Sequence, residues 1–427
     1  MKNKILFILF FSFLLVNFSS AKDIALNNEE EVNIFNQAVS FYNSNNYNAV
    51  IKAINVLLEK NPNIAEAYNL RGNAYYSIGE YDLAVKDFTE AIKIDVKFSD
   101  AYKSRAESYR LQKKYDLAVN DLNTLIEIDP ENYSFYYNRG ILHIESNDKQ
   151  LAIADLTKSI ALNPNNYVAF ITRGELLYHL KNYEQAKHDL DTAINLNTEA
   201  IDAYKLHATI DLEMQNYDEA IKYYNIALNL KPKDEDALFY RGLTFMESSK
   251  IDEAINDFNT LLENTTNKDR TNYYLALAYY RNSKYKEAIK CLDKVHTYRE
   301  NINLSELRGN INYLDGNYEE ATRDYTKALS EMPDSIELLK NRGNCFYNIK
   351  KHEEAINDYT QLLKLNKDAT ILHNRANSYR ALEKYKEAIN DCKEFINIAQ
   401  TDNNLKMFIS DVEKEIEYME YKCNEKK

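Results

Sequence analysis

The sequence predicts an all-α protein, a solenoid of stacked helical hairpins, and three observations support this. A single repeat of 33 or 34 residues runs through most of the 427-residue chain. Glycine, with 8 residues, and proline, with 5, are scarce for this length, which disfavours loop-rich β architectures. An aromatic share of 12% argues against disorder. One hairpin cannot cover its own apolar surface, so the units must stack.

The first 21 residues precede the repeats and have the pattern of a secretory signal peptide. Lys2 and Lys4 form a positive segment, Ile5–Val16 is apolar apart from one serine, and small residues end at Ala21. We therefore expect cleavage near Ala21, export to the periplasm or outside the cell, and a flexible leader over residues 22–30. The apolar run is shorter than the roughly 20 residues that a spanning helix needs. An uncleaved N-terminal anchor is the alternative, and no later stretch could span a bilayer.

Eleven units follow, and each is expected to hold two antiparallel helices. They begin at residues 31, 65, 99, 133, 167, 201, 235, 269, 302, 336 and 369, and together cover residues 31–402. The eighth residue of a unit is glycine or alanine, and the twentieth is alanine in every unit but the first. Such small residues let two helices approach closely. All five prolines lie at the thirty-second position, where proline ends the second helix.

This pattern strongly resembles the tetratricopeptide repeat (TPR) family, whose unit is a helix–turn–helix. The resemblance implies a right-handed superhelical α-solenoid. The family's tryptophan at the fourth position is absent, and Tyr68, Tyr102 and Phe170 are among the residues that replace it. Residues 403–427 depart from the repeat. Their apolar residues follow a helical stripe that includes Phe408 and Ile416, which predicts a C-terminal capping helix.

The seventh and twenty-third positions of the units vary together. Eight units carry arginine at one and aspartate at the other: Arg71 and Asp87, Arg105 and Asp121, Arg139 and Asp155, Arg173 and Asp189, Arg241 and Asp257, Arg308 and Asp324, Arg342 and Asp358, and Arg375 and Asp391. The three units without the arginine, which begin at residues 31, 201 and 269, also lack the aspartate. We expect a structural ion pair that fixes helix register, within a unit or across the stack. An arginine ladder for an anionic ligand is the alternative.

The resemblance also implies a concave groove lined by positions 2, 5, 9, 12 and 13 of each unit. In units four to eight these positions are largely apolar: Tyr137, Ile141, Ile144, Ile171, Tyr178, Phe239, Leu243, Met246, Tyr273, Leu277 and Tyr280. We expect these side chains to have no intramolecular neighbour and hence to form a peptide-binding patch. The alternative is that superhelical curvature or the N-terminal segment covers part of them.

Units nine to eleven are polar at neighbouring positions of the groove. The residues are Asn310, Lys340, Asn341, Asn344, Asn374 and Asn377. A carboxamide both donates and accepts, so such a ladder could hold an extended peptide backbone whatever its side chains. Lys340, Asn344 and Asn374 also resemble part of the family's carboxylate clamp, although its lysine–arginine pair is missing here. Asparagine is abundant throughout the chain, so placement without a role is the alternative.

Catalytic and metal chemistry find little support in the sequence. The histidines lack metal-ligand spacing, no glycine is left for a phosphate-binding loop, and Cys291, Cys345, Cys392 and Cys423 match no zinc or redox signature. The net charge of −13 argues against nucleic acid as a partner. We expect a non-catalytic exported scaffold without cofactor or metal, monomeric without ligand, that binds peptide or protein segments. A self-associating envelope component and an accessory subunit of a secretion or glycosyl-transfer machine are the alternatives.

Overall fold

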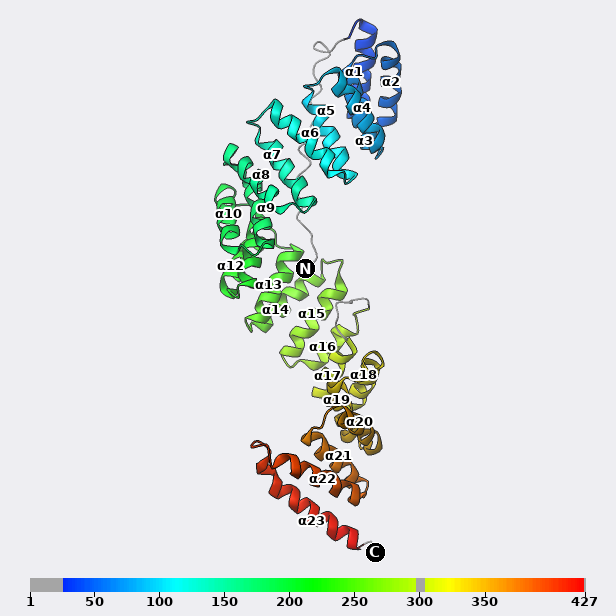
Figure 1. Ribbon diagram of the computed structural model, residues 1–427, viewed down its shortest axis with the longest axis vertical. Helices are drawn as coiled ribbons and strands as arrows, with labels where there is room; N and C mark the ends of the chain where they lie inside the picture. Colours follow the sequence, from blue (N-terminus) through cyan, green and yellow to red (C-terminus); the bar gives the residue numbers. More distant parts are fainter. Residues whose placement is uncertain (1–25, 297–303, 426–427) are drawn as a thin grey trace. The chain divides into compact units, whose positions relative to one another are not determined.

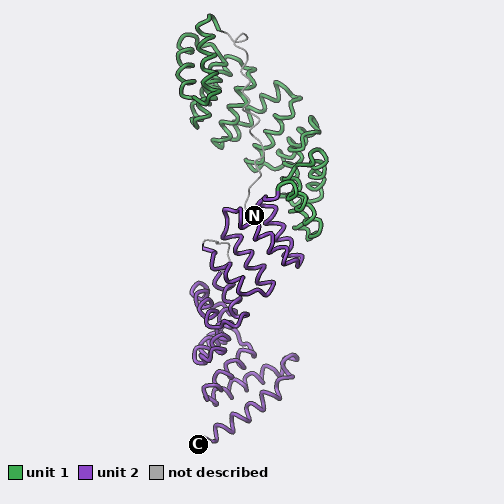
Figure 2. The backbone as a smooth tube through the Cα atoms, turned by 180° about the vertical axis from the view of Figure 1, so that it is seen from behind, with its two compact units in different colours: residues 1–231 green, residues 232–427 purple. Residues whose placement is uncertain are grey.

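The computed structural model describes residues 26–296 and 304–425, and the predicted signal peptide lies outside them. Every regular element in these ranges is helical, with α1–α23 and one short 3-10 helix at Lys406–Phe408 (Figure 1). Successive helices pair in tandem, so the all-α fold of stacked antiparallel hairpins is confirmed. The chain divides into unit 1, residues 1–231, and unit 2, residues 232–427 (Figure 2).

Unit 1 contains six consecutive hairpins. Their helices are α1 (Glu29–Asn43), α2 (Tyr47–Lys60), α3 (Ala65–Ser77), α4 (Tyr81–Ile94), α5 (Ser99–Leu111), α6 (Tyr115–Ile128), α7 (Tyr133–Glu145), α8 (Lys149–Leu162), α9 (Tyr167–His179), α10 (Tyr183–Leu196), α11 (Ile201–Glu213) and α12 (Tyr217–Leu230). Each odd-numbered helix, called a first helix below, packs against the even-numbered helix that follows it.

Unit 2 continues the pattern with five hairpins and a last helix. The helices are α13 (Glu235–Glu247), α14 (Ile251–Leu262), α15 (Lys268–Arg281), α16 (Tyr285–Leu292), α17 (Leu304–Leu314), α18 (Tyr318–Glu331), α19 (Ile336–Asn348), α20 (His352–Leu365), α21 (Ala369–Ala381), α22 (Tyr385–Ala399) and α23 (Ile409–Glu425). The first helices of this unit are α13, α15, α17, α19 and α21. Helix α23 packs on α22.

Small side chains set the close contact inside each hairpin. A Cβ added at Gly72 would lie 2.6 Å from the ring of Phe88, and one at Gly309 would lie 2.8 Å from the ring of Tyr325. Glycine at the eighth position therefore makes room for the large ring opposite in these two hairpins. The turn inside the hairpin needs a positive φ, which Gly79 adopts at 84°. Most of the hairpin turns in the described residues use a non-glycine residue instead, such as Asn147 at 67°.

Helix α23 closes the end of unit 2. Val412, Ile416 and Met419 are buried against Phe395 and other apolar residues of the last hairpin. Phe408, which the sequence places on the same stripe, is instead 47% exposed, because the 3-10 turn before α23 takes it out of the helical register. Among the described residues, no helix is both long and apolar enough to cross a bilayer.

Candidate functional site

The eight arginine–aspartate pairs join the two helices of their hairpins. In one such pair, Nε of Arg139 donates to Oδ2 of Asp155 at 2.8 Å, and Nη2 of Arg139 donates to Oδ1 of Asp155 at 2.6 Å. The other pairs repeat this arrangement except Arg308, whose Nε and Nη2 both approach Oδ1 of Asp324. All eight aspartates are buried. Each of these arginines is thus already paired with a carboxylate. An arginine ladder for an anionic ligand would need unpaired guanidinium groups, and these eight arginines do not supply them.

The same arginines also reach the preceding hairpin. Nη1 of Arg105 donates to Oγ1 of Thr89 at 3.0 Å, and Nη1 of Arg139 donates to Oδ1 of Asn123 at 2.6 Å. Similar contacts run from Arg71, Arg173, Arg342 and Arg375. The pair therefore acts within a hairpin and across the stack at once. This second partner was not predicted from the sequence, because the accepting residue is asparagine in some hairpins and threonine in others.

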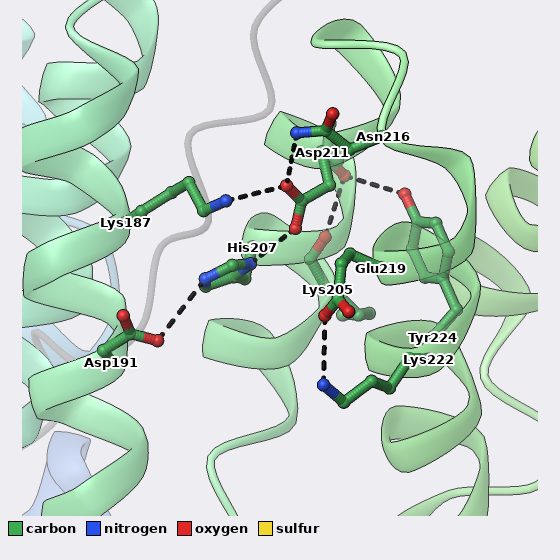
Figure 3. Close-up of polar contacts among 10 residues, drawn as sticks. Lys187, Asp191, Lys205, His207, Asp211, Asn216, Glu219, Lys222 and Tyr224 are labelled. Carbon is green, nitrogen blue, oxygen red and sulfur yellow. Dashed lines mark hydrogen bonds and ion pairs between the residues drawn. The ribbon is translucent and has the colours of Figure 1, made fainter.

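The hairpin of α11 and α12 replaces this pair with a buried histidine (Figure 3). Nδ1 of His207 lies 2.9 Å from Oδ2 of Asp211, and Nε2 lies 3.4 Å from Oδ1 of Asp191 in the preceding hairpin. The His207 ring stacks on Tyr223 with the centroids 3.9 Å apart. Lys187 donates to the other oxygen of Asp211 at 2.8 Å. His207 thus contacts the second helix of its own hairpin through Tyr223 and the preceding hairpin through Asp191, the two connections that an arginine makes in other units.

The charge state of Asp211 follows from these contacts. Its side chain is fully buried, and burial by itself raises the pKa of a carboxyl group. Hydrogen bonds from His207 and Lys187 outweigh that effect and hold the pKa of Asp211 below its usual value. Asp211 is therefore an anion at neutral pH that ties α11 to α10. Neither Asp211 nor Lys187 was predicted from the sequence to have a structural or functional role.

The predicted apolar patch lies mostly inside the stack. Tyr137, Ile171, Tyr178, Phe239, Met246 and Tyr273 are buried, and Ile141, Ile144, Leu243, Leu277 and Tyr280 are half-buried. The expectation that these side chains have no intramolecular neighbour is wrong. The next first helix covers them, as where the Tyr178 hydroxyl donates to Glu213 at 2.5 Å. Ligand binding by these residues stays a prediction.

Charged residues accompany this apolar row in unit 1. Arg110 on α5 donates to Glu107 on the same helix at 2.7 Å and to Glu145 on α7 at 2.8 Å. All three side chains are at most 13% exposed. Burial and the nearby charge of Glu107 raise the pKa of Glu145, and Arg110 counteracts them only in part, so the pKa stays above its usual value. These ion pairs at groove positions leave few free donors or acceptors there.

The predicted polar ladder is built differently, in unit 2. Oδ1 of Asn310 on α17 accepts from the Tyr325 hydroxyl at 2.7 Å and lies 3.4 Å from Nδ2 of Asn341 on α19. The next hairpin repeats this arrangement. There Oδ1 of Asn344 accepts from the Tyr359 hydroxyl at 2.7 Å, and Asn374 on α21 approaches the same oxygen at 3.4 Å. We call these four asparagines the asparagine row.

The tyrosines fix how the asparagine row is oriented. Burial raises the pKa of both Tyr325 and Tyr359, so each hydroxyl stays protonated and can donate. Oδ1 of Asn310 and of Asn344 is thereby occupied. Their Nδ2 groups have no hydrogen-bond partner in the part of the chain that the structure describes, and both side chains are half-buried. The row therefore presents amide donors that the fold itself does not use.

Two members of the predicted ladder stand apart from this row. Lys340 is exposed, and Asn377 has no tyrosine opposite, since Cys392 takes that place in its hairpin. The asparagines were predicted from their repeat positions, whereas Tyr325 and Tyr359 were not. The available signal was weak: two units combine asparagine at the ninth position with tyrosine at the twenty-fourth, but Asn73 and Asn377 occur without the tyrosine.

The described residues offer little for chemistry at a single centre. They hold no group of three or more His, Cys, Asp or Glu side chains that could bind a metal ion. Cys291, Cys345 and Cys392 are buried free thiols, and Cys423 is half-buried. Burial raises the pKa of the Cys345 and Cys392 thiols to about 12, which opposes thiolate chemistry. A cavity of about 720 Å³ has Arg342 among its lining residues. The guanidinium of Arg342 already pairs with Asp358, so its charge is not available to a ligand in that cavity.

Comparison with known families identifies the repeats. Models described as tetratricopeptide repeat match residues 65–98, 133–166, 336–369 and 369–401, and a model described as TPR repeat matches residues 106–147. A model described as anaphase-promoting complex, cyclosome, subunit 3, matches residues 213–295. No curated protein matches the chain.

Solved structures show the same kind of helix pairs. The MamA protein is 25% identical over 39% of this chain and 90% of its own, with a TM-score of 0.36. YrrB, described as a TPR protein with an unusual peptide-binding site, is 20% identical over 44% and 97%, with a TM-score of 0.37. The C-terminal part of a TPR repeat-containing protein from Cytophaga hutchinsonii is 20% identical over 56% and 99%, with a TM-score of 0.49. Because these TM-scores are below 0.5, the solved structures are not used to identify the repeats. That the chain consists of TPR repeats follows from the family models and from its tandem helix pairs.

Proposed function

Since the chain is a TPR repeat protein with many tandem helix pairs, we propose that it is a non-catalytic scaffold whose unit 2 binds extended protein segments through the asparagine row. The row would hold the main chain of the segment rather than particular side chains. Main-chain carbonyl groups recur along any extended segment, and each can accept from a fixed amide donor.

The observation that carries this proposal is the unused amide donor on Asn310 and Asn344. Each amide is held by a buried tyrosine and by the asparagine of the next hairpin. A held side chain loses little conformational entropy when a ligand binds, so its hydrogen bonds contribute more to affinity. The repeat of the same contact in two hairpins favours a ligand that itself repeats, and a polypeptide backbone does.

Substitution of Asn344 by aspartate tests the donor directly. Aspartate keeps an oxygen for Tyr359 and Asn374 but replaces the free NH₂ group with a second acceptor. We expect N344D to remain folded by circular dichroism and to bind a mixture of random-sequence peptides at least about tenfold more weakly, as the loss of one such hydrogen bond implies. The matched control is N377D, in the hairpin without the tyrosine. Equal binding by N344D and the wild type would refute the row as the binding site.

We also propose export, on the sequence pattern of residues 1–21 alone. Cleavage near Ala21 would leave Lys22 as the first residue, in the periplasm or outside the cell. Mass spectrometry of the protein recovered from the producing cell tests this, because the intact chain and the cleaved chain differ by the mass of the leader. Recovery of the full-length chain from the cytoplasm would refute it.

A further inference from the structure

Among the described residues of unit 2, one arginine lacks the carboxylate partner that the others have. Arg270, in the first turn of α15, makes no ion pair among the described residues, and its buried Nε has no hydrogen-bond partner there. Every other arginine in those residues has a carboxylate within 4 Å. An unpaired guanidinium that is partly withdrawn from water is costly unless a ligand completes it.

The guanidinium of Arg270 is held in a defined position by an aromatic platform. Its central carbon lies 3.7 Å from the centroid of the Phe239 ring, the shortest cation–π contact among the described residues. Phe239 is buried and is itself fixed by Tyr274, whose ring meets it edge-on at 5.0 Å. Stacking on one face leaves the planar edge of a guanidinium, with its two Nη groups, available to a single anion.

The sequence position of Arg270 also favours an anion. It is the second residue of its repeat unit, and no other unit carries a cation there, while several carry an acid such as Asp202 or Glu337. It lies at the N-terminal end of a helix, where the helix dipole disfavours a cation and favours an anion. An arginine at this place therefore opposes local stability, and Asp269 in the same turn accepts from the backbone N–H of His296 without forming an ion pair with Arg270.

We propose that Arg270 and Phe239 form an anion-binding site that takes the carboxylate side chain of an aspartate or glutamate in the bound protein segment. The proposal rests on the proposed function, since the ligand is the segment held by unit 2. One guanidinium on an apolar floor matches one carboxylate through two parallel hydrogen bonds. The partial likeness to a clamp for a chain terminus lies at other residues, Lys340, Asn344 and Asn374.

Three fluorescein-labelled peptides test the site by fluorescence anisotropy. The first has capped ends and alternating alanine and glutamate, the second has glutamine in place of glutamate, and the third is the glutamine peptide with a free C-terminal carboxylate. We expect the wild type to bind the glutamate peptide at least about tenfold more tightly than the glutamine peptide, the factor that one charge-assisted contact supplies. R270Q should remove this preference, and R270K should keep part of it because a lysine has no planar fork.

Two controls keep the outcomes separate. R323Q removes an exposed arginine on α18 that pairs with Glu320, and it should leave all three affinities unchanged. N344D should weaken the uncharged glutamine peptide as well as the charged peptides, and N377D, which adds the same charge, corrects for repulsion of the carboxylates. Equal binding of the glutamate and glutamine peptides, both weakened by N344D, would overturn the Arg270 site and keep the proposed function. Dependence on Arg270 for the free terminus alone would overturn the side-chain assignment, and no binding of any peptide would overturn both.

Discussion

Between successive first helices, α5 and α7 of unit 1 are joined by charged groups, whereas α17, α19 and α21 of unit 2 are joined by neutral amides. In unit 1, Arg110 links α5 to Glu145 on α7. In unit 2, Asn341 on α19 approaches Asn310 on α17, which also holds the Tyr325 hydroxyl. In an ion pair the two charges neutralise each other. A side-chain amide that accepts a hydrogen bond through its oxygen still has two N–H groups to donate. The difference explains why we place the ligand on unit 2.

The largest predicted effect concerns a contact that both units share. Replacing Asp155 by alanine leaves Arg139 without its buried carboxylate, and should lower the free energy of unfolding of that region by about 3 kcal/mol. Replacing Asp358 in unit 2 should cost the same, because Arg342 has the same geometry. Hydrogen exchange of α8 and α20 measures the two losses locally. Unequal losses would mean that the units differ in more than their first-helix contacts.

A paired substitution controls this result. The hairpin of α15 and α16 naturally carries Leu275 and Cys291 in place of arginine and aspartate, and both are buried. Changing Arg139 to leucine together with Asp155 to cysteine should therefore recover part of the loss, since two apolar groups leave no buried charge unpaired. A double variant no more stable than Asp155→Ala would show that the pair does more than satisfy its own charges.

The arginine–aspartate pairs also show what a sequence can reveal. Arg139 and Asp155 vary together with their counterparts, so their contact follows from the repeat alone. The groove is different, because its exposure depends on how closely successive hairpins pack, and no residue encodes that by itself. Tyr178 was predicted to face a ligand, yet its hydroxyl meets Glu213 on the next first helix. Single features such as Asp211 and Arg270 escape a search for repetition because they occur once.

The second prediction concerns pH and is confined to unit 1. K187M removes one of the two donors that lower the pKa of Asp211 against the effect of burial. A lowered pKa stabilises the fold above the ordinary aspartate pKa of about 4, and that stability is lost as pH falls through the folded value. At pH 7 we expect K187M to be less stable by about 2 kcal/mol, the value of a hydrogen bond to a charged group. The difference should shrink as the solution is acidified below pH 4.

Two measurements separate this effect from a general one. K222M removes an exposed lysine that pairs with Glu219 at 3.0 Å, and should change stability little at any pH. The four cysteines all lie in unit 2, so the rate at which Cys345 and Cys392 react with a thiol reagent reports on unit 2 alone. K187M should leave that rate unchanged. A constant loss from pH 7 to pH 3 would contradict the role of Asp211 ionisation.

The third prediction removes one phenol from the asparagine row. Y359F deletes the hydroxyl that donates to Asn344 and should cost about 1 kcal/mol, the net value of a typical hydrogen bond. The amide of Asn344 then keeps only the longer contact with Asn374. We expect faster labelling of Cys345 and weaker binding of peptides, because the donor is no longer held in place. Lower stability with unchanged peptide affinity would show that the row needs no fixed orientation.

The smallest predicted effect comes from the equivalent tyrosine of unit 1. Tyr224 occupies the same repeat position, and its hydroxyl lies 3.0 Å from Oγ1 of Thr209. That threonine also donates to the carbonyl of Lys205 at 2.8 Å, so it keeps a partner when the phenol is lost. Y224F should therefore cost only about 0.5 kcal/mol, at the low end for one hydrogen bond, and should leave peptide binding unchanged. Hydrogen exchange of α12 and peptide anisotropy measure both quantities. If Y224F weakened peptide binding as much as Y359F, the asparagine row of unit 2 would not be the sole binding site. Ligand binding would then have to be sought along the first helices of unit 1 as well.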